Sequence, residues 1–155
     1  MKDNKTLIKE SLDMSYYGAQ LAIICTVAFF VYIIAILLAF VNAGKILPYL
    51  ILYTFLILPF IVYYIVKIYY IKKQPEKYII TEAFPCKIES SFGRRVALLL
   101  EIENADGSFS EIQTNPIFGM SILENLYFGD HLGNRLQILY DKEGERVVVV
   151  KIIES

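Results

Sequence analysis

The residues that could take part in acid–base chemistry are few and lie in the second half of the chain. His131 is the single histidine, and Asp130 precedes it within the glycine-containing stretch Phe128–Gly133. A hydrolase of the serine type needs a histidine, an acidic residue that orients it and a nucleophile beside it. The stretch supplies only the first two, so we interpret it as a solvated loop. An enzyme that hydrolyses a substrate at the lipid interface is the alternative.

Carboxylates form the second candidate group. Glu101 and Glu103 alternate on one face of a predicted strand, and Glu111 follows on the next strand. Such a set could bind a cation or act as an acid–base pair, but we expect an exposed polar face. Cys25 and Cys86 lie in different regions, so the sequence predicts neither a zinc site nor a disulfide. It contains no glycine-rich phosphate loop, and we predict no catalytic residue, metal or cofactor.

The composition separates the chain into two parts. Apolar residues make up 56% of its 155 residues, above the roughly 45–50% of an ordinary soluble protein. Lys45 and Lys67 are the only charged residues between positions 19 and 71. Residues 72–155 have ten Lys or Arg against thirteen Asp or Glu, a net charge of −3, and offer no basic surface to nucleic acid. A membrane anchor followed by a water-exposed domain explains this separation.

Two apolar runs predict a transmembrane hairpin. Residues 21–41 and 46–66 each contain twenty-one uncharged residues, fourteen of them Leu, Ile, Phe or Val. Each run spans about 31 Å as a helix, the thickness of the hydrocarbon core. The turn between them is too short for anything but antiparallel neighbours. The predicted organisation is a polar N-terminal segment, a hairpin with spans at about 19–41 and 46–70, a basic linker and a small β domain: 1–17, 18–71, 72–77 and 78–155.

Within the hairpin, three features suggest how the spans pack. Pro59 removes a backbone hydrogen bond in mid-span and predicts a kink, whereas Lys67 can extend its ammonium group toward the headgroups. Small residues form one stripe on the first span, which we expect to pack against the second span or, alternatively, to form a homodimer. The stripe consists of Gly18, Ala22, Cys25, Ala28, Tyr32, Ala35 and Ala39.

The distribution of lysine predicts the orientation. Three lysines precede the first span and four end or follow the second, against Lys45 alone in the turn. Because positive residues concentrate on the cytoplasmic side, both termini should be cytoplasmic in a cell membrane. Six tyrosines would form an aromatic belt at the same interface: Tyr16, Tyr17, Tyr63, Tyr64, Tyr69 and Tyr70. A cleaved signal peptide is the alternative interpretation of the first span.

After residue 77 the pattern changes to short stretches of β-branched and aromatic residues between turn residues. Asx and Gly at 104–107 and 141–144 predict hairpin turns with positive φ. The final strand is apolar on both faces and should be central, and a short helix is expected within 117–127. The fold class is therefore a membrane helical hairpin with a five-stranded, mostly antiparallel open barrel or curled sheet. The strands are predicted at 78–90, 95–103, 109–114, 135–140 and 146–153.

These features resemble a known class of sequences. Two spans, a lysine-flanked exit, a hairpin at Ala105-Asp106-Gly107 and Gly133 followed by the apolar alternation of Leu136–Asp141 resemble uncharacterised bacterial membrane proteins with a C-terminal β domain. The chain departs from that class at Lys142–Glu145, where a proline-containing turn is common. The resemblance implies an architecture and no activity.

The sequence favours a non-catalytic role. We expect the bilayer to hold the β domain at the inner leaflet, where a sheet edge binds or regulates another protein by accepting a strand. An immunity protein against a membrane-acting toxin is the alternative within the binding class. An enzyme at the lipid interface, using His131, Asp130, Glu101 and Glu103, is the alternative from another class.

Overall fold

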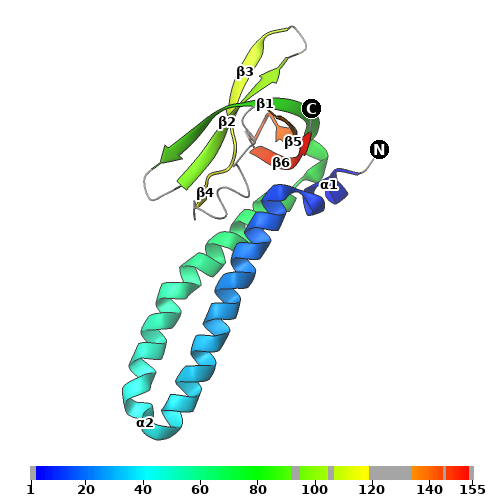
Figure 1. Cartoon of the computed structure of the whole chain (residues 1–155). Coiled ribbons are helices and arrows are strands. Elements are labelled where there is room, and N and C mark those ends of the chain that lie inside the picture. Colours follow the sequence, from blue (N-terminus) through cyan, green and yellow to red (C-terminus); the bar gives the residue numbers. More distant parts are fainter. Residues whose placement is uncertain (1–2, 92–94, 105–106, 119–133, 145, 154–155) are drawn as a thin grey trace. The chain divides into compact units, whose positions relative to one another are not determined.

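The chain forms two compact units, Ser15–Tyr70 and Met1–Met14 together with Ile71–Ser155 (Figure 1). We refer to them as the hairpin unit and the β unit. The computed structural model describes the backbone alone at 41–43 and 90–91 and otherwise describes residues 3–91, 95–104, 107–118, 134–144 and 146–153.

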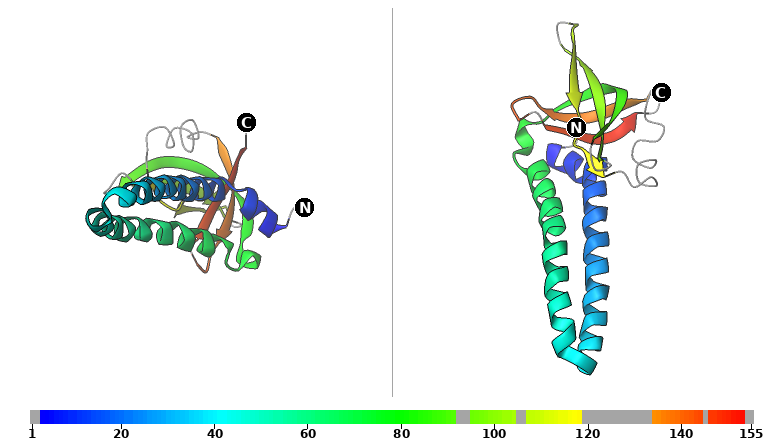
Figure 2. Two further views of the ribbon diagram at one scale, coloured as in Figure 1. Left: turned by 90° about the horizontal axis from the view of Figure 1, so that it is seen from below. Right: turned by 90° about the vertical axis from the view of Figure 1, so that its left-hand side faces the viewer.

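The hairpin unit is formed by helix α2 (Leu12–Lys72), which folds back on itself as two arms (Figures 1 and 2). The arms are antiparallel, because tyrosines far apart in the sequence pair across them. The ring centroids of Tyr17 and Tyr64 are 6.2 Å apart, and those of Tyr32 and Tyr53 are 5.9 Å apart. The predicted helical hairpin is therefore confirmed.

The contact face of each arm follows an 11-residue repeat. Less exposed side chains recur at spacings of 4, 3 and 4 residues, close to the 3.6 residues of a helical turn, so one face stays in contact along the arm. On the first arm these are Tyr17, Leu21, Ile24, Ala28, Tyr32, Ala35 and Ala39, and on the second Ile46, Leu50, Tyr53, Ile57, Ile61, Tyr64 and Ile68.

The predicted stripe of small residues matches this face only in part. Its members from Ala28 to Ala39 lie on the contact face, but Ala22 and Cys25 are exposed, and Leu21 and Ile24 take their places. Residues 22 and 28 are six positions apart, which places them about 120° apart around a helix. A single narrow face cannot include both.

A polar chain joins the arms at mid-length. The hydroxyl of Thr54 donates to the C=O of Leu50 at 2.8 Å, so the contact between the hydroxyls of Tyr32 and Thr54 has Tyr32 as its donor. A hydrogen bond between helices in an apolar setting contributes about 0.6 kcal/mol on average. The aromatic residues also contribute to packing, since Tyr16, Tyr17 and Tyr64 are buried, whereas Tyr69 and Tyr70 are exposed. The predicted aromatic belt at the membrane interface stays a prediction.

The β unit is an antiparallel sheet that is not closed. Its strands have the order β3-β2-β1-β5-β6, with the short β4 paired to β2 (Figure 1), and this is the curled-sheet form of the predicted fold. Two short helices, α1 and η1, belong to the same unit. The elements are α1 (Asn4–Glu10), η1 (Pro75–Lys77), β1 (Ile79–Ser91), β2 (Arg95–Glu103), β3 (Phe109–Gln113), β4 (Ile117–Phe118), β5 (Arg135–Asp141) and β6 (Arg146–Ile153).

Strand β1 connects the two halves of the sheet. Its first part, Ile79–Ala83, pairs with β5, and its second part, Phe84–Ser91, pairs with β2. The register with β2 shifts between Pro85 and Lys87, which leaves Cys86 as the extra residue of a bulge. Proline is tolerated in a strand at such a bulge, and a bulge bends the strand. The predicted continuation of this strand past Pro85 is confirmed.

Alternation of apolar residues builds the core. On β2, the side chains of Val96, Leu98, Leu100 and Ile102 are all buried, and they point to one face of the sheet because strand residues alternate between faces. Leu136 and Ile138 on β5, with Val148 on β6, are fully buried in the same unit. The core therefore lies on the face of β2 opposite to its two glutamates.

One prediction about the β unit is wrong, and another lies mostly outside the described residues. Strand β6 is buried on both faces at Val147–Val150, yet it is the edge strand and not a central one. A short helix was expected within 117–127, and the first two residues of that range form β4, where Ile117 pairs with Val96. The rest of that expected helix lies outside the described residues.

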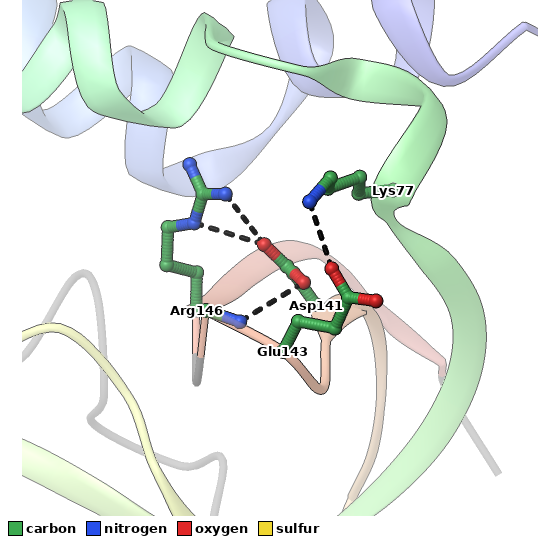
Figure 3. Close-up of polar contacts among 5 residues, drawn as sticks. Lys77, Asp141, Glu143 and Arg146 are labelled. Atoms are coloured by element: carbon green, nitrogen blue, oxygen red, sulfur yellow. Dashed lines mark hydrogen bonds and ion pairs between the residues drawn. The ribbon is translucent and has the colours of Figure 1, made fainter.

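The two predicted turns use glycine for different reasons. Gly107 has φ of 80°, the positive value expected at a hairpin turn. Gly144 lacks positive φ, so that part of the prediction is wrong, but a Cβ there would lie 2.6 Å from Asp141 Oδ2. Its N–H donates to Asp141 Oδ1 at 3.1 Å, and Arg146 Nε donates to Oδ2 at 3.0 Å (Figure 3). The second turn needs glycine because a side chain would displace this carboxylate.

The electrostatics of this turn are set by Asp141. Burial disfavours its charge, but the N–H of Gly144 and the guanidinium of Arg146 outweigh that effect and hold its pKa below the ordinary value. The guanidinium also lies 5.7 Å from the ring of Tyr78, whose pKa is raised by burial. An exposed ion pair between Lys77 and Glu143, at 2.7 Å, flanks the turn (Figure 3).

We predict that Asp141→Asn lowers the free energy of unfolding of the full-length chain by about 1–3 kcal/mol at pH 7, because Arg146 loses a charged partner. A lowered pKa stabilises the fold above the unfolded value near 3.8 and loses that effect as the pH falls through the folded value. Urea denaturation in detergent micelles, followed by circular dichroism between pH 2 and 7, measures the loss of stability and its dependence on pH. Glu143→Gln is the control and should change little. An unchanged acid dependence in Asp141→Asn would contradict the assignment.

Candidate binding site

One edge of the sheet is covered by side chains. The backbone N–H of Val149 donates to Asp13 Oδ2 at 3.1 Å, and the C=O of Val147 accepts from Asn115 Nδ2 at 2.9 Å. In an antiparallel ladder, groups that bond outward alternate with groups that bond to the neighbouring strand. Both contacts therefore occupy outward groups of β6, and a further strand could pair there only by displacing them.

The segment that contains Asp13 is fixed to the β unit. Asn4 Nδ2 donates to the carbonyl oxygens of Pro75 and Tyr78, at 3.0 and 2.8 Å. Ser11 ends α1 and accepts from the N–H of Met14 at 3.2 Å, as a helix N-cap does. Ser11 and Asp13 are 0% and 1% exposed. The sequence predicted a separate polar N-terminal segment at 1–17, but its first fourteen residues belong to the β unit.

The other edge, β3, has outward backbone groups with no partner among the described residues. The backbone N–H of Thr114 donates to the C=O of Leu98 at 2.9 Å, and the backbone N–H of Asn104 donates to the C=O of Ser108 at 2.8 Å. Bonded and non-bonded residue pairs alternate along an antiparallel ladder. Since Leu98–Thr114 and Asn104–Ser108 are bonded pairs, Ser110 and Ile112 also bond to β2. The N–H and C=O groups that point outward belong to Phe109, Glu111 and Gln113.

The exposed face beside this edge is acidic. Glu101 lies directly opposite Glu111, and Glu103 lies opposite Phe109, which confirms that Glu111 lies across the hairpin from the other two. The ring of Phe109 is 61% exposed. Partial desolvation of its sulfur and nearby Glu101 raise the pKa of the Cys86 thiol, although the residue as a whole is exposed. Like charges directly opposite each other destabilise a strand pair. Lys87, opposite Leu99, and Arg95 lie on the same face of the sheet. Among the described residues, however, no Lys or Arg forms an ion pair with these three glutamates.

A hollow lies along the same edge. It has a volume of about 350 Å³ and is lined by Glu111, Ile112 and Gln113 of the β3 edge together with Tyr140 and Val147. The last two residues face each other across β5 and β6. The hollow therefore lies between β3 and the β5–β6 pair, at the side where the sheet is not closed.

The remaining predicted candidates are not brought together in the described part of the chain. Lys67 is half-buried, with its ammonium 6.0 Å from the ring centroid of Tyr63. Cys25 and Cys86 are both free and exposed. The described residues contain no group of three or more His, Cys, Asp or Glu that could hold a metal ion. His131 and Asp130 lie outside the described residues.

No protein family, curated protein or solved structure matched the chain. The resemblance to bacterial two-span membrane proteins therefore stays a prediction.

Sequence reasoning missed the two side chains that cover β6. Asp13 is the last acidic residue before the first apolar run, and Asn115 lies two residues after the end of β3. An acidic residue in the first turn of a helix is usual, so nothing distinguished Asp13 from an ordinary helix start. Only the position of β6 at the edge gives both residues their role.

We predict that Asp13→Ala lowers the free energy of unfolding by about 1–3 kcal/mol, because the buried N–H of Val149 loses its acceptor. Hydrogen exchange of the Val149 amide should become faster in the same variant. Urea denaturation and exchange measured by mass spectrometry check the two effects. Asp3→Ala, at an exposed aspartate of the same segment that makes no helix-capping hydrogen bond, is the control. Exchange at Val149 that equals that of the control would show that Asp13 does not protect it.

Proposed function

We propose that this chain is an integral protein of a bacterial inner membrane whose hairpin spans the bilayer and whose β unit binds another protein through the β3 edge. The proposed role is non-catalytic. The observation on which it rests is the difference between the two edges of the sheet. Asp13 and Asn115 cover β6, whereas the outward groups of β3 have no partner among the described residues.

The hairpin supports the membrane part of the proposal. Its arms, Leu12–Phe40 and Gly44–Lys72, contain windows of mean hydropathy 3.0 and 2.2, and only 6% of each window is buried. The core helix of a soluble protein would be mostly buried. An exposed apolar surface of this extent is unfavourable in water, whereas helices of 29 residues are long enough to cross the hydrocarbon core.

The lysine distribution supports a cytoplasmic location for both termini. We predict that a reporter active only in the cytoplasm works when fused after Ser155, and that one active only outside it does not. A matched pair of fusions in the turn, after Gly44, should give the opposite result. Activity of the external reporter after Ser155 would overturn the orientation and place the β unit outside.

Exposed edge strands are sites of strand addition in many complexes. The protein-binding part of the proposal is supported by the outward groups of β3, by the hollow beside them and by the exposed ring of Phe109. All three features involve residues of β3, and the hollow is completed by Tyr140 of β5 and Val147 of β6. A partner segment that pairs with β3 would contact all of them.

We predict that benzoylphenylalanine in place of Phe109 crosslinks the chain to another protein in living cells under ultraviolet light. The control position is Ile79, which is 64% exposed against 61% for Phe109 and is also at a strand of the β unit. Mass spectrometry of the adducts identifies the partner. Adducts that form equally at both positions, or at Ile79 alone, would count against the β3 edge.

A further inference from the structure

We propose that the partner of the β3 edge is an extended polypeptide segment with Lys or Arg at alternate positions. This inference rests on the proposed function and names the chemistry of the partner. It follows from three properties of the edge: the alternation of its backbone groups, the charge of its exposed face and the aromatic ring at its end.

The backbone of β3 determines the conformation of the partner. Outward N–H and C=O groups recur at every second residue, on Phe109, Glu111 and Gln113. A segment that satisfies them must itself be extended, since β-strand pairing needs the same repeat in both strands. About five residues of partner would cover this length. Side chains of the partner that share a face with Glu111 must then alternate with side chains on the opposite face.

The charge of the exposed face determines which side chains alternate there. Glu111 lies between Glu101 on one side and the position of a partner residue on the other. Residues directly opposite each other across neighbouring strands have Cβ atoms about 4.5–5.5 Å apart, so a Lys or Arg at the partner position reaches the carboxylate of Glu111. The described residues include no Lys or Arg in an ion pair with Glu101, Glu103 or Glu111.

The two ends of the edge differ. Gln113 is already engaged, since its Nε2 donates to Glu89 at 2.9 Å. At the other end, Phe109 offers an exposed ring opposite Glu103, and cations are attracted to ring faces. Arg135 shows this contact elsewhere in the unit, 4.9 Å from the ring centroid of Phe84. The basic residues of the partner should therefore lie beside Glu111 and Phe109.

Direct binding tests the proposal. The full-length chain in phosphatidylcholine nanodiscs is titrated with two capped synthetic peptides, Lys-Val-Lys-Val-Lys-Val-Lys and its counterpart with Glu at every Lys. We expect the lysine peptide to bind at least about tenfold more tightly, from the charge pairing and the ring contact together. Glu111→Gln should weaken the lysine peptide several-fold, whereas the control Glu76→Gln, at an exposed glutamate of η1, should not.

A backbone variant separates strand pairing from simple charge attraction. The N–H of Glu111 points outward, so Glu111→Pro removes a donor to the partner and no bond to β2. We expect it to abolish binding of the lysine peptide and to keep the melting temperature of the chain. If this variant does not fold, a lysine peptide with N-methyl groups at alternate residues tests the same pairing from the other side and should not bind.

Equal binding of the two peptides, or binding that survives both Glu111→Pro and N-methylation, would overturn the proposal. The crosslink at position 109 distinguishes its failure from that of the proposed function. A crosslinked protein with no binding of the lysine peptide means that the edge binds a partner of different chemistry. Absence of both means that the edge is not a binding site.

Discussion

Backbone N–H and C=O groups at the margins of an open sheet have no neighbouring strand, and a buried group of this kind destabilises the fold unless it finds another partner. Strand β6 is buried on both faces, so its outward groups are in this position. The carboxylate of Asp13 and the amide of Asn115 provide the missing partners. Through Asp13, the first residues of the chain become part of a unit whose strands lie more than sixty residues later.

The same constraint operates within the hairpin unit. Prolines at 48 and 59 lie inside α2, and each removes an N–H from the helix. Side chains can take part in the polar contacts that remain, as Thr54 does when it donates to the C=O of Leu50 and accepts from Tyr32. An apolar helix surface thus includes a polar contact between its arms. The two units differ in this respect. In the hairpin unit the hydroxyl of Thr54 adds a second donor to a helical carbonyl and links the arms, whereas Asp13 and Asn115 bond to strand groups that have no neighbouring strand.

Local pattern was sufficient for much of the fold. The alternation in Arg95–Glu103 and the bounds of Arg146–Ile153 were predicted because a period of two and flanking turn residues are local signals. What failed depends on distant residues. Four consecutive valines make the last strand read as central, because the sequence does not show that side chains such as Asp13, and not another strand, bond to its outward backbone groups. The opposition of Glu101 and Glu111 was predictable from a short hairpin, but which edge stays open was not, since that depends on Asn115 reaching Val147.

An edge such as β3, whose outward groups have no partner in the described part of the chain, could also pair with a second copy of the same chain. If two β3 strands paired antiparallel about their midpoint, Glu111 of one copy would lie opposite Glu111 of the other, with Glu101 on either side. Four carboxylates on one face oppose that arrangement, because like charges across strands are destabilising. The charges that disfavour self-pairing are those that favour a basic segment. Glu101 and Glu111 therefore make the edge selective in two ways. They repel the β3 strand of a second copy, and they attract a segment that contains Lys or Arg.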